Sequence, residues 1–276
     1  MARMTDQEAR YDRIAEGYAT WWSPVHRSAT LGLLDEVDDD VAAGAACVLD
    51  VGCGTGAFAA AAVRRWPAAT VHALDASTGM LRVAERERAA LPADEAARIR
   101  LGHGYADRLP FEDGIFDVVV SAFVLQLVPS RHRALREMGR VLRPGGRLAY
   151  VTWLRGGPPF PADDAFDDAL DALGLEPREP AGGHDDPASP AAVEAGLHRA
   201  GFASARARAV DLVHQFTPES YLAFLARFDE EDRFNRLDPD VRSRLEAALL
   251  ARLRHLPPGG LRLVLPIVYA TARRAR

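Results

Sequence analysis

A glycine-rich segment, VLDVGCGTGAF at residues 48–58, is the part of the chain best suited to hold a ligand. Gly52, Gly54 and Gly56 follow an apolar run at alternate positions. A strand that runs into such a loop and then into a helix brings backbone N–H groups and a helix N-terminus close to a ligand. Side chains at these positions would hold the ligand away or prevent the tight turn. Because GCGTGA also fits the dinucleotide pattern GxGxxG/A, the loop alone leaves a nicotinamide cofactor open.

A carboxylate follows at the spacing expected for a ribose contact. Asp75 ends the segment TVHALD, 19 residues beyond Gly56. Charge-assisted hydrogen bonds from two ribose hydroxyls to such a carboxylate would contribute about 1.5–3 kcal/mol each. The alternative is that Asp75 only caps a helix starting at Ala76 or Ser77. Its position at the end of a strand favours ribose binding.

Composition excludes several functional classes. The 276 residues are close to the upper limit for one hydrophobic core, so a single domain over 1–276 is predicted. The net charge of -5 disfavours nucleic acid as a partner. All 34 basic residues are arginine, which excludes a lysine Schiff base or a P-loop lysine. Cys47 and Cys53 are predicted to be free thiols, and with no CxxC pair no metal site is expected.

The chain shows no membrane or export signal. No apolar run approaches the roughly 20 residues of a membrane-spanning helix. The start, MARMTDQEARYDR, lacks the apolar region of a signal peptide. A cytoplasmic location is therefore predicted.

The middle of the chain, residues 46–153, alternates short apolar strands with single helices, which predicts a parallel sheet covered on both faces. The expected strands are 47–51, 70–75, 98–104, 116–122 and 147–153, and the expected helices are 57–66, 78–91 and 131–142.

The segments on either side of residues 46–153 do not continue this alternation of strands and helices. Residues 1–45 are expected to form helices, the first over 7–22 and ended by Pro24. Segments 154–200 and 214–258, the former rich in Pro, Gly and Asp, are interpreted as cap insertions. Residues 201–213 and 261–273 are predicted as the last strands.

Four segments in order carry a resemblance: VLDVGCGTGAF, HALDAS, DRLPFEDGIFDVVVSAFVLQLVPS and LREMGRVLRPGGRLAYVTW. Together they resemble class I S-adenosylmethionine-dependent methyltransferases, above all the small-molecule group typified by ubiquinone and menaquinone biosynthesis. The match covers residues 47–153. It implies an α/β, Rossmann-like, doubly wound seven-stranded sheet with an antiparallel last strand, plus N-terminal helices and a helical cap. It also implies S-adenosyl-L-methionine as cofactor.

The resemblance assigns cofactor contacts residue by residue. The first strand and glycine loop would face the methionine end, Asp75 the ribose, and Met80 the adenine. Where the family commonly has GDAxxLPF this chain has GYADRLPF, which puts Tyr105 in the slot of the acidic residue and leaves the adenine contact to its ring or to the Ala106 backbone. Ser121 and Phe123 would flank the sulfur, and aromatic residues of the first helix would close over the cofactor. The expected cofactor-binding residues are Tyr11, Tyr18, Asp50, Gly52, Cys53, Gly54, Thr55, Gly56, Asp75, Ala76, Met80, Tyr105, Ala106, Ser121 and Phe123.

Catalytic residues are less clearly marked. Methyl transfer is an in-line displacement, and a general base is needed only if the acceptor must lose a proton. Some relatives carry a histidine after the fourth strand, where this chain has Gln126, which can orient an acceptor but cannot take its proton. His132, His184 and His214 are the other candidates for a catalytic role. The alternative for each is a purely structural or surface role.

The predicted function is methyl transfer to a small, apolar or aromatic metabolite, such as a quinone precursor or a secondary metabolite. The predicted partners are that acceptor and, optionally, a second copy of the chain. Two alternatives remain open at this point: a nicotinamide-dependent reductase and a non-catalytic cofactor-binding protein.

Overall fold

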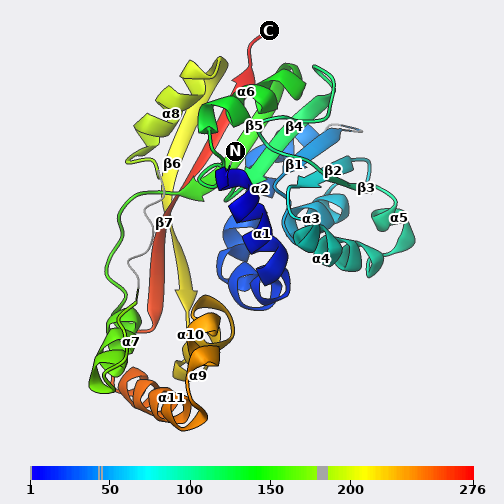
Figure 1. The fold of residues 1–276 in the computed structure, drawn as a ribbon. Coiled ribbons are helices and arrows are strands. Elements are labelled where there is room, and N and C mark those ends of the chain that lie inside the picture. The colour runs from blue at the N-terminus through cyan, green and yellow to red at the C-terminus, as the bar shows by residue number, and fades with distance from the viewer. Residues whose placement is uncertain (1, 43, 45, 179–185) are drawn as a thin grey trace. The chain divides into compact units, whose positions relative to one another are not determined.

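The computed structural model describes residues 2–42, 44, 46–178 and 186–276. Seven strands form one sheet in the order β3-β2-β1-β4-β5-β7-β6 (Figure 1). The strands are β1 (Cys47–Val51), β2 (Thr70–Asp75), β3 (Ile99–His103), β4 (Phe116–Ala122), β5 (Leu142–Trp153), β6 (Phe202–Gln215) and β7 (Arg262–Arg274).

The sheet has the topology that the resemblance implied. Neighbouring strands from β3 to β5 pair in parallel. β7 lies antiparallel to β5, with Leu148 opposite Ala272. The predicted fold class is therefore confirmed. The strand order also reverses beside β1 and β4, the point where open α/β sheets bind their ligands.

Helices cover both faces of the sheet. α2 (Ser23–Val41), α3 (Ala57–Arg65) and α4 (Thr78–Ala89) contact the strands from one side. On the other side, α6 (Arg131–Val141) and α8 (Pro190–Arg199) enclose a core that includes Leu49 and Val51 of β1. Since side chains alternate along a strand, Asp50 faces the α2 side.

The N-terminal helices differ from expectation. Pro24 was predicted to end the first helix, and that prediction is wrong. α1 (Ala2–Gly17) continues into a π-helical turn, η1 (Tyr18–Trp22), and then into α2, where Pro24 occupies the first turn. The proline is accommodated because the regular hydrogen-bond ladder is already interrupted just before it, where the Ser23 N–H bonds to the Tyr18 carbonyl in the π-turn. π-Turns inside helices often mark functional sites.

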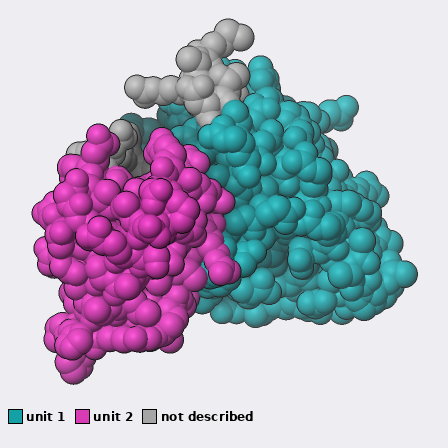
Figure 2. Space-filling model, turned by 60° about the horizontal axis from the view of Figure 1, so that its bottom comes forward, with its two compact units in different colours: residues 1–155, 184–210, 266–276 teal, residues 156–183, 211–265 magenta. Residues whose placement is uncertain are grey.

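The chain divides into two compact units, coloured separately in Figure 2. The first comprises residues 1–155, 184–210 and 266–276, and the second comprises residues 156–183 and 211–265. The single-domain organisation stays a prediction. The remaining helices are α5 (Ala93–Ala96) in the first unit and α7 (Pro161–Ala172), α9 (Pro218–Phe224), η2 (Leu225–Asp229), α10 (Glu231–Arg236) and α11 (Pro239–Arg254) in the second.

The second unit has its own core and polar network. The rings of Phe166 and Phe234 stack with centroids 6.0 Å apart. Arg178 pairs with Asp163 at 3.0 Å and with Asp167 at 2.7 Å. These contacts tie α7 to the segment that follows it.

Candidate functional site

A cleft in the first unit lies at the carboxyl ends of β1, β2 and β4, beneath α1. Its empty space, including solvent at the mouth, is about 840 Å³. The predicted cofactor residues among its lining are Tyr11, Tyr18, Gly52, Gly54, Asp75, Ala76, Met80, Tyr105, Ala106 and Phe123.

The glycine loop has the backbone shape that only glycine adopts readily. Gly52, Gly54 and Gly56 have φ of +72°, +53° and +83°. A Cβ on Gly52 would lie 2.1 Å from Cγ2 of Val124, whereas nothing lies within 4 Å of a Cβ on Gly54. The Gly54 main chain therefore faces open space in the cleft.

Asp75 joins this loop to the end of β2. Its Oδ2 accepts from the Gly54 N–H at 2.8 Å, and its Oδ1 accepts from the Ser77 N–H at 2.8 Å. Burial raises the pKa of Asp75, and backbone N–H groups, those of Ser77 and Gly54 first, oppose the rise. The N-cap of α4 is Ser77, which accepts from the Met80 N–H, so Asp75 does not cap that helix.

Asp50 carries an unsatisfied carboxylate atom. Its side chain is 2% exposed, and Oδ2 has no hydrogen-bond partner among the described residues. Burial, with a smaller contribution from Asp75, raises the pKa of Asp50 to about 8. Asp50 lines a second cavity together with Cys53 and Thr55, and the two cavities share Gly52, Gly54, Tyr18 and Ala122. A buried oxygen without a donor suits a ligand that brings a positive charge or an N–H group.

Tyr105 closes the opposite end of the cleft. Its hydroxyl donates to Oε2 of Glu8 on α1 at 3.0 Å, and the Arg108 guanidinium lies 4.8 Å from its ring centroid. The ring lines the cleft beside Ala106 and Asp107. Glu8 is a lining residue that the sequence analysis missed.

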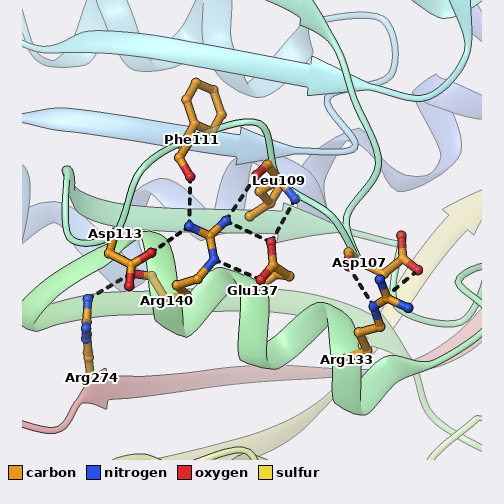
Figure 3. Close-up of polar contacts among 8 residues, drawn as sticks. All are labelled: Asp107, Leu109, Phe111, Asp113, Arg133, Glu137, Arg140 and Arg274. Atoms are coloured by element: carbon orange, nitrogen blue, oxygen red, sulfur yellow. Dashed lines mark hydrogen bonds and ion pairs between the residues drawn. The ribbon is translucent and has the colours of Figure 1, made fainter.

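Figure 3 shows how α6 holds the loop that carries these residues. Arg140 donates to the carbonyl oxygens of Phe111 at 2.7 Å and Leu109 at 3.0 Å. Glu137 accepts from the Leu109 N–H at 2.9 Å and pairs with Arg140. This pairing raises the pKa of Arg140 and lowers that of Glu137. The loop wall is thus fixed by two charged side chains of a neighbouring helix.

A carboxylate of α1 holds that helix over the cleft. Oδ1 of Asp12 accepts from the Gly79 N–H and from the Ser77 hydroxyl, both at 2.7 Å. These hydrogen bonds lower the pKa of Asp12. A Cβ on Gly79 would lie 2.7 Å from the Asp12 carbonyl oxygen, so the close approach of the two helices requires glycine. The sequence analysis missed this contact.

A tyrosine–histidine pair lies at the inner end of the cleft. The Tyr18 hydroxyl is 2.7 Å from Nε2 of His26, and Nδ1 of His26 is 3.4 Å from the Thr30 hydroxyl. His26 is 6% exposed, and burial lowers its pKa to about 4. Burial also raises the pKa of Tyr18. Both groups are therefore neutral near pH 7.

Aromatic rings surround this pair. The His26 ring centroid lies 5.1 Å from that of Phe123 and 6.1 Å from that of Trp22. Trp153 packs on Phe123 at 4.2 Å. Phe123 adopts φ +57°, a left-handed conformation that is uncommon for a bulky residue and often occurs at functional sites.

The predicted residues near the end of β4 have structural partners. Ser121 is buried and donates to the Val51 carbonyl at 2.9 Å. Gln126 donates from Nε2 to the Phe123 carbonyl at 2.7 Å, and its Oε1 accepts from the Thr152 hydroxyl at 2.9 Å. Gln126 thus supports the Phe123 turn.

His132 and His214 are not among the residues that line the cleft, and the third candidate histidine falls outside the described residues. His132 is on the exposed side of α6. His214 belongs to the second unit, where its ring packs on Phe216 at 4.4 Å. His184 lies outside the described residues. His26, which the sequence analysis did not select, is the histidine that lines the cavity beside Asp50.

The described residues show neither a metal site nor a membrane-spanning helix. They contain no group of three or more His, Cys, Asp or Glu side chains that could hold a metal ion. Within the same residues, no helix is both long and apolar enough to cross a bilayer.

The fold and the cleft define a Rossmann-like α/β protein with a site for a nucleoside-containing ligand. Residues 49–150 match the family model described as a methyltransferase domain. This match confirms the predicted resemblance to class I S-adenosylmethionine-dependent methyltransferases over that segment of the chain.

Two curated relatives resemble part of the chain. Malonyl-[acyl-carrier protein] O-methyltransferase of Herminiimonas arsenicoxydans is 36% identical over 149 residues, which are 48% of this chain and 53% of the relative. Demethylmenaquinone methyltransferase of Staphylococcus aureus is 42% identical over 101 residues, which are 36% of this chain and 40% of the relative. The chain thus spans about half or less of the length of these relatives.

Solved structures share the fold over most of the chain. The YcgJ protein of Bacillus subtilis has a TM-score of 0.58 at 22% identity, covering 90% of this chain and 99% of that one. The [4+2]-cyclase SpnF has a TM-score of 0.54 at 23% identity, covering 88% and 80%. Since one neighbour is titled a cyclase, the fold by itself does not decide the reaction.

Proposed function

We propose that the protein transfers a methyl group from S-adenosyl-L-methionine to a small metabolite. The observation that carries the proposal is the joined arrangement of Gly54 and Asp75 at the carboxyl end of the sheet, inside a segment that matches a methyltransferase domain. When bound, the cofactor supplies a methyl group already activated on a sulfonium.

The residues of the cleft fit the chemistry of that cofactor. The open main chain at Gly54 leaves space where a Cβ would stand, and Asp75 offers a carboxylate for ribose hydroxyls. The unsatisfied oxygen of Asp50 would accept from the ammonium of the methionine end. Tyr105 and Met80 would contact the adenine. α1, held by Asp12, would exclude water from the reacting end.

The acceptor is proposed to be apolar or aromatic. Trp22, Phe123 and Trp153 pack together next to Tyr18 and His26, with Trp22 and Trp153 centroids 6.2 Å apart. Aromatic side chains of this kind bind flat apolar molecules through area and ring geometry. Holding such a molecule against the methyl group can supply roughly 7–11 kcal/mol of the barrier. The cytoplasmic location, a place in secondary metabolism and the oligomeric state stay predictions.

Isothermal titration calorimetry with S-adenosylmethionine, S-adenosylhomocysteine and NADH tests the proposal. We expect both sulfur nucleosides to bind and NADH not to bind. Incubation with methyl-labelled cofactor and a panel of aromatic metabolites should then give labelled product. Binding of NADH alone, or no binding of either sulfur nucleoside at millimolar concentration, would refute the proposed function.

A further inference from the structure

We propose that His26, acting through Tyr18, receives the proton released when an O–H acceptor is methylated. The acceptor class that this implies is a phenol or an enol, because these groups become strong nucleophiles as they lose a proton. The inference rests on the proposed function and deepens it.

The position of Tyr18 supports this role. Tyr18 lines both cavities, so it faces the main cleft and also the space that holds His26 and Asp50. The hydroxyl-to-Nε2 distance of 2.7 Å is that of a well-formed hydrogen bond. Asp75 and Tyr105 mark the nucleoside side of the cleft, while the His26 ring lies against Phe123 at the end of β4. Tyr18 thus stands between the nucleoside side and His26.

The chemistry of the neighbouring side chains also favours His26 as the base. Gln126 has no basic group, and its amide is engaged by Phe123 and Thr152. A neutral imidazole whose Nδ1 carries the proton leaves Nε2 free to accept from the Tyr18 hydroxyl. A proton could then pass from acceptor to Tyr18 while Tyr18 passes its own proton to Nε2.

The side chains around His26 permit it to receive a proton. The other titratable or charged side chains of its cavity are Tyr18, Arg27, Asp50 and Cys53. Burial raises the pKa of the Cys53 thiol and of Asp50, so both are largely uncharged at neutral pH. Thr30 on the same helix is placed to accept from Nδ1.

The reaction balances in atoms and charge. The acceptor oxygen bonds to the methyl carbon as the carbon–sulfur bond breaks and its electron pair stays on sulfur. The acceptor proton goes to the Tyr18 oxygen, and the Tyr18 proton goes to Nε2. Among the reacting groups there is one positive charge before the transfer, on sulfur, and one after it, on the imidazole. In a poorly solvated cavity, loss of the first charge favours appearance of the second.

Histidine-labelled NMR gives a readout that does not depend on turnover. The resonance of His26 is assigned with His26→Gln, and its pKa is measured with S-adenosylmethionine and with S-adenosylhomocysteine bound. We expect the pKa to be lower in the first complex by about one unit or more, because the sulfonium repels the imidazolium. His72, half-buried on β2 between Phe111 and Phe116, is the internal control and should titrate alike in both.

Coinciding His26 pKa values in the two complexes would overturn the inference and leave the proposed function standing. Failure of both nucleosides to bind would remove both proposals. A second measurement separates proton transfer from mere packing. For methylation of a phenol, Tyr18→Phe and His26→Gln should each lower kcat about 100-fold near pH 7. The loss should shrink as the pH approaches the phenol's own pKa of about 10. Wild-type kcat in either variant would also overturn the inference.

Discussion

Two ends of the cleft are built in different ways: the nucleoside end, so named for the ligand that we propose it binds, and the inner, aromatic end. At the nucleoside end, the glycine loop and Asp75 lie at adjacent strand ends and join through a 2.8 Å bond between Gly54 and Asp75. At the inner end, Tyr18 and His26 come from a π-turn and the helix after it, and the His26 ring packs on Phe123, the residue that follows β4. The first is a backbone site supported by the sheet, whereas the second is a side-chain site on added helices.

This difference indicates how the two ends can vary. A backbone site needs particular glycines and strand ends, so it ties sequence closely to one ligand. A side-chain site on helices can change its reactive groups without disturbing the sheet. The cofactor should therefore depend on the first region and the acceptor on the second.

The sharpest test of that division is Asp75→Asn. Loss of the charge weakens the hydrogen bonds from the ribose, so affinity for S-adenosylhomocysteine should fall about 100-fold, close to 3 kcal/mol. Titration calorimetry measures this. Asp94→Asn, an exposed carboxylate on α5, is the matched control and should leave affinity unchanged. Unchanged affinity in Asp75→Asn would show that the Asp75 carboxylate does not contribute to binding of the nucleoside.

Asp50→Asn should separate stability from binding. The pKa of Asp50 is about 8 in the folded protein, above its ordinary value of 3.8. This group therefore favours folding fully only below pH 4, and its contribution is lost as the pH rises to 8. At pH 7 the free energy of unfolding of the variant should exceed that of the wild type by about 2–4 kcal/mol. This gain in stability should fade toward pH 4.

The same variant should bind S-adenosylhomocysteine about tenfold more weakly, because the ammonium of the ligand favours an ionised carboxylate beside it and an amide cannot ionise. Denaturant melts across this pH range and calorimetry give both numbers. A destabilised Asp50→Asn protein at pH 7 would contradict the account of an unsatisfied buried acid.

The sequence predicted much of the nucleoside end of the cleft but little of the inner, aromatic end. The strands and the loop at Gly52 were predictable because their signals are local: apolar runs, glycines at alternate positions and an acid at a strand end. The antiparallel direction of β7 was expected from the family resemblance alone. The Tyr18–His26 pair was not predicted, since an eight-residue separation across a π-turn breaks ordinary helical periodicity. The prediction that Pro24 ends a helix also failed, because the rule cannot tell a last turn from a first one.

Polar contacts between residues far apart in the chain could not be predicted from the sequence either. Asp12 meets Gly79 and Glu8 meets Tyr105 only because α1 folds over the sheet, and no spacing in the sequence encodes that. A signal was present for the second pair: Tyr105 replaces the family's acidic residue, and Glu8 supplies a carboxylate next to it from another element. Such a replacement can be recognised only when the position of α1 over the sheet is known.

The smallest expected effect concerns the wall of the nucleoside end. Arg140→Gln removes the donors to Leu109 and Phe111 but leaves Tyr105 in place. Affinity for S-adenosylhomocysteine should fall only about threefold to tenfold, because a loosened loop must be ordered again on binding. Hydrogen exchange of residues 107–113 should speed up in the free protein. Arg143→Gln, which loses an ion pair with Asp117 instead, is the control and should change neither measurement. If exchange in the loop stays slow in Arg140→Gln, the sheet rather than α6 holds this wall, and the nucleoside end is a backbone site throughout.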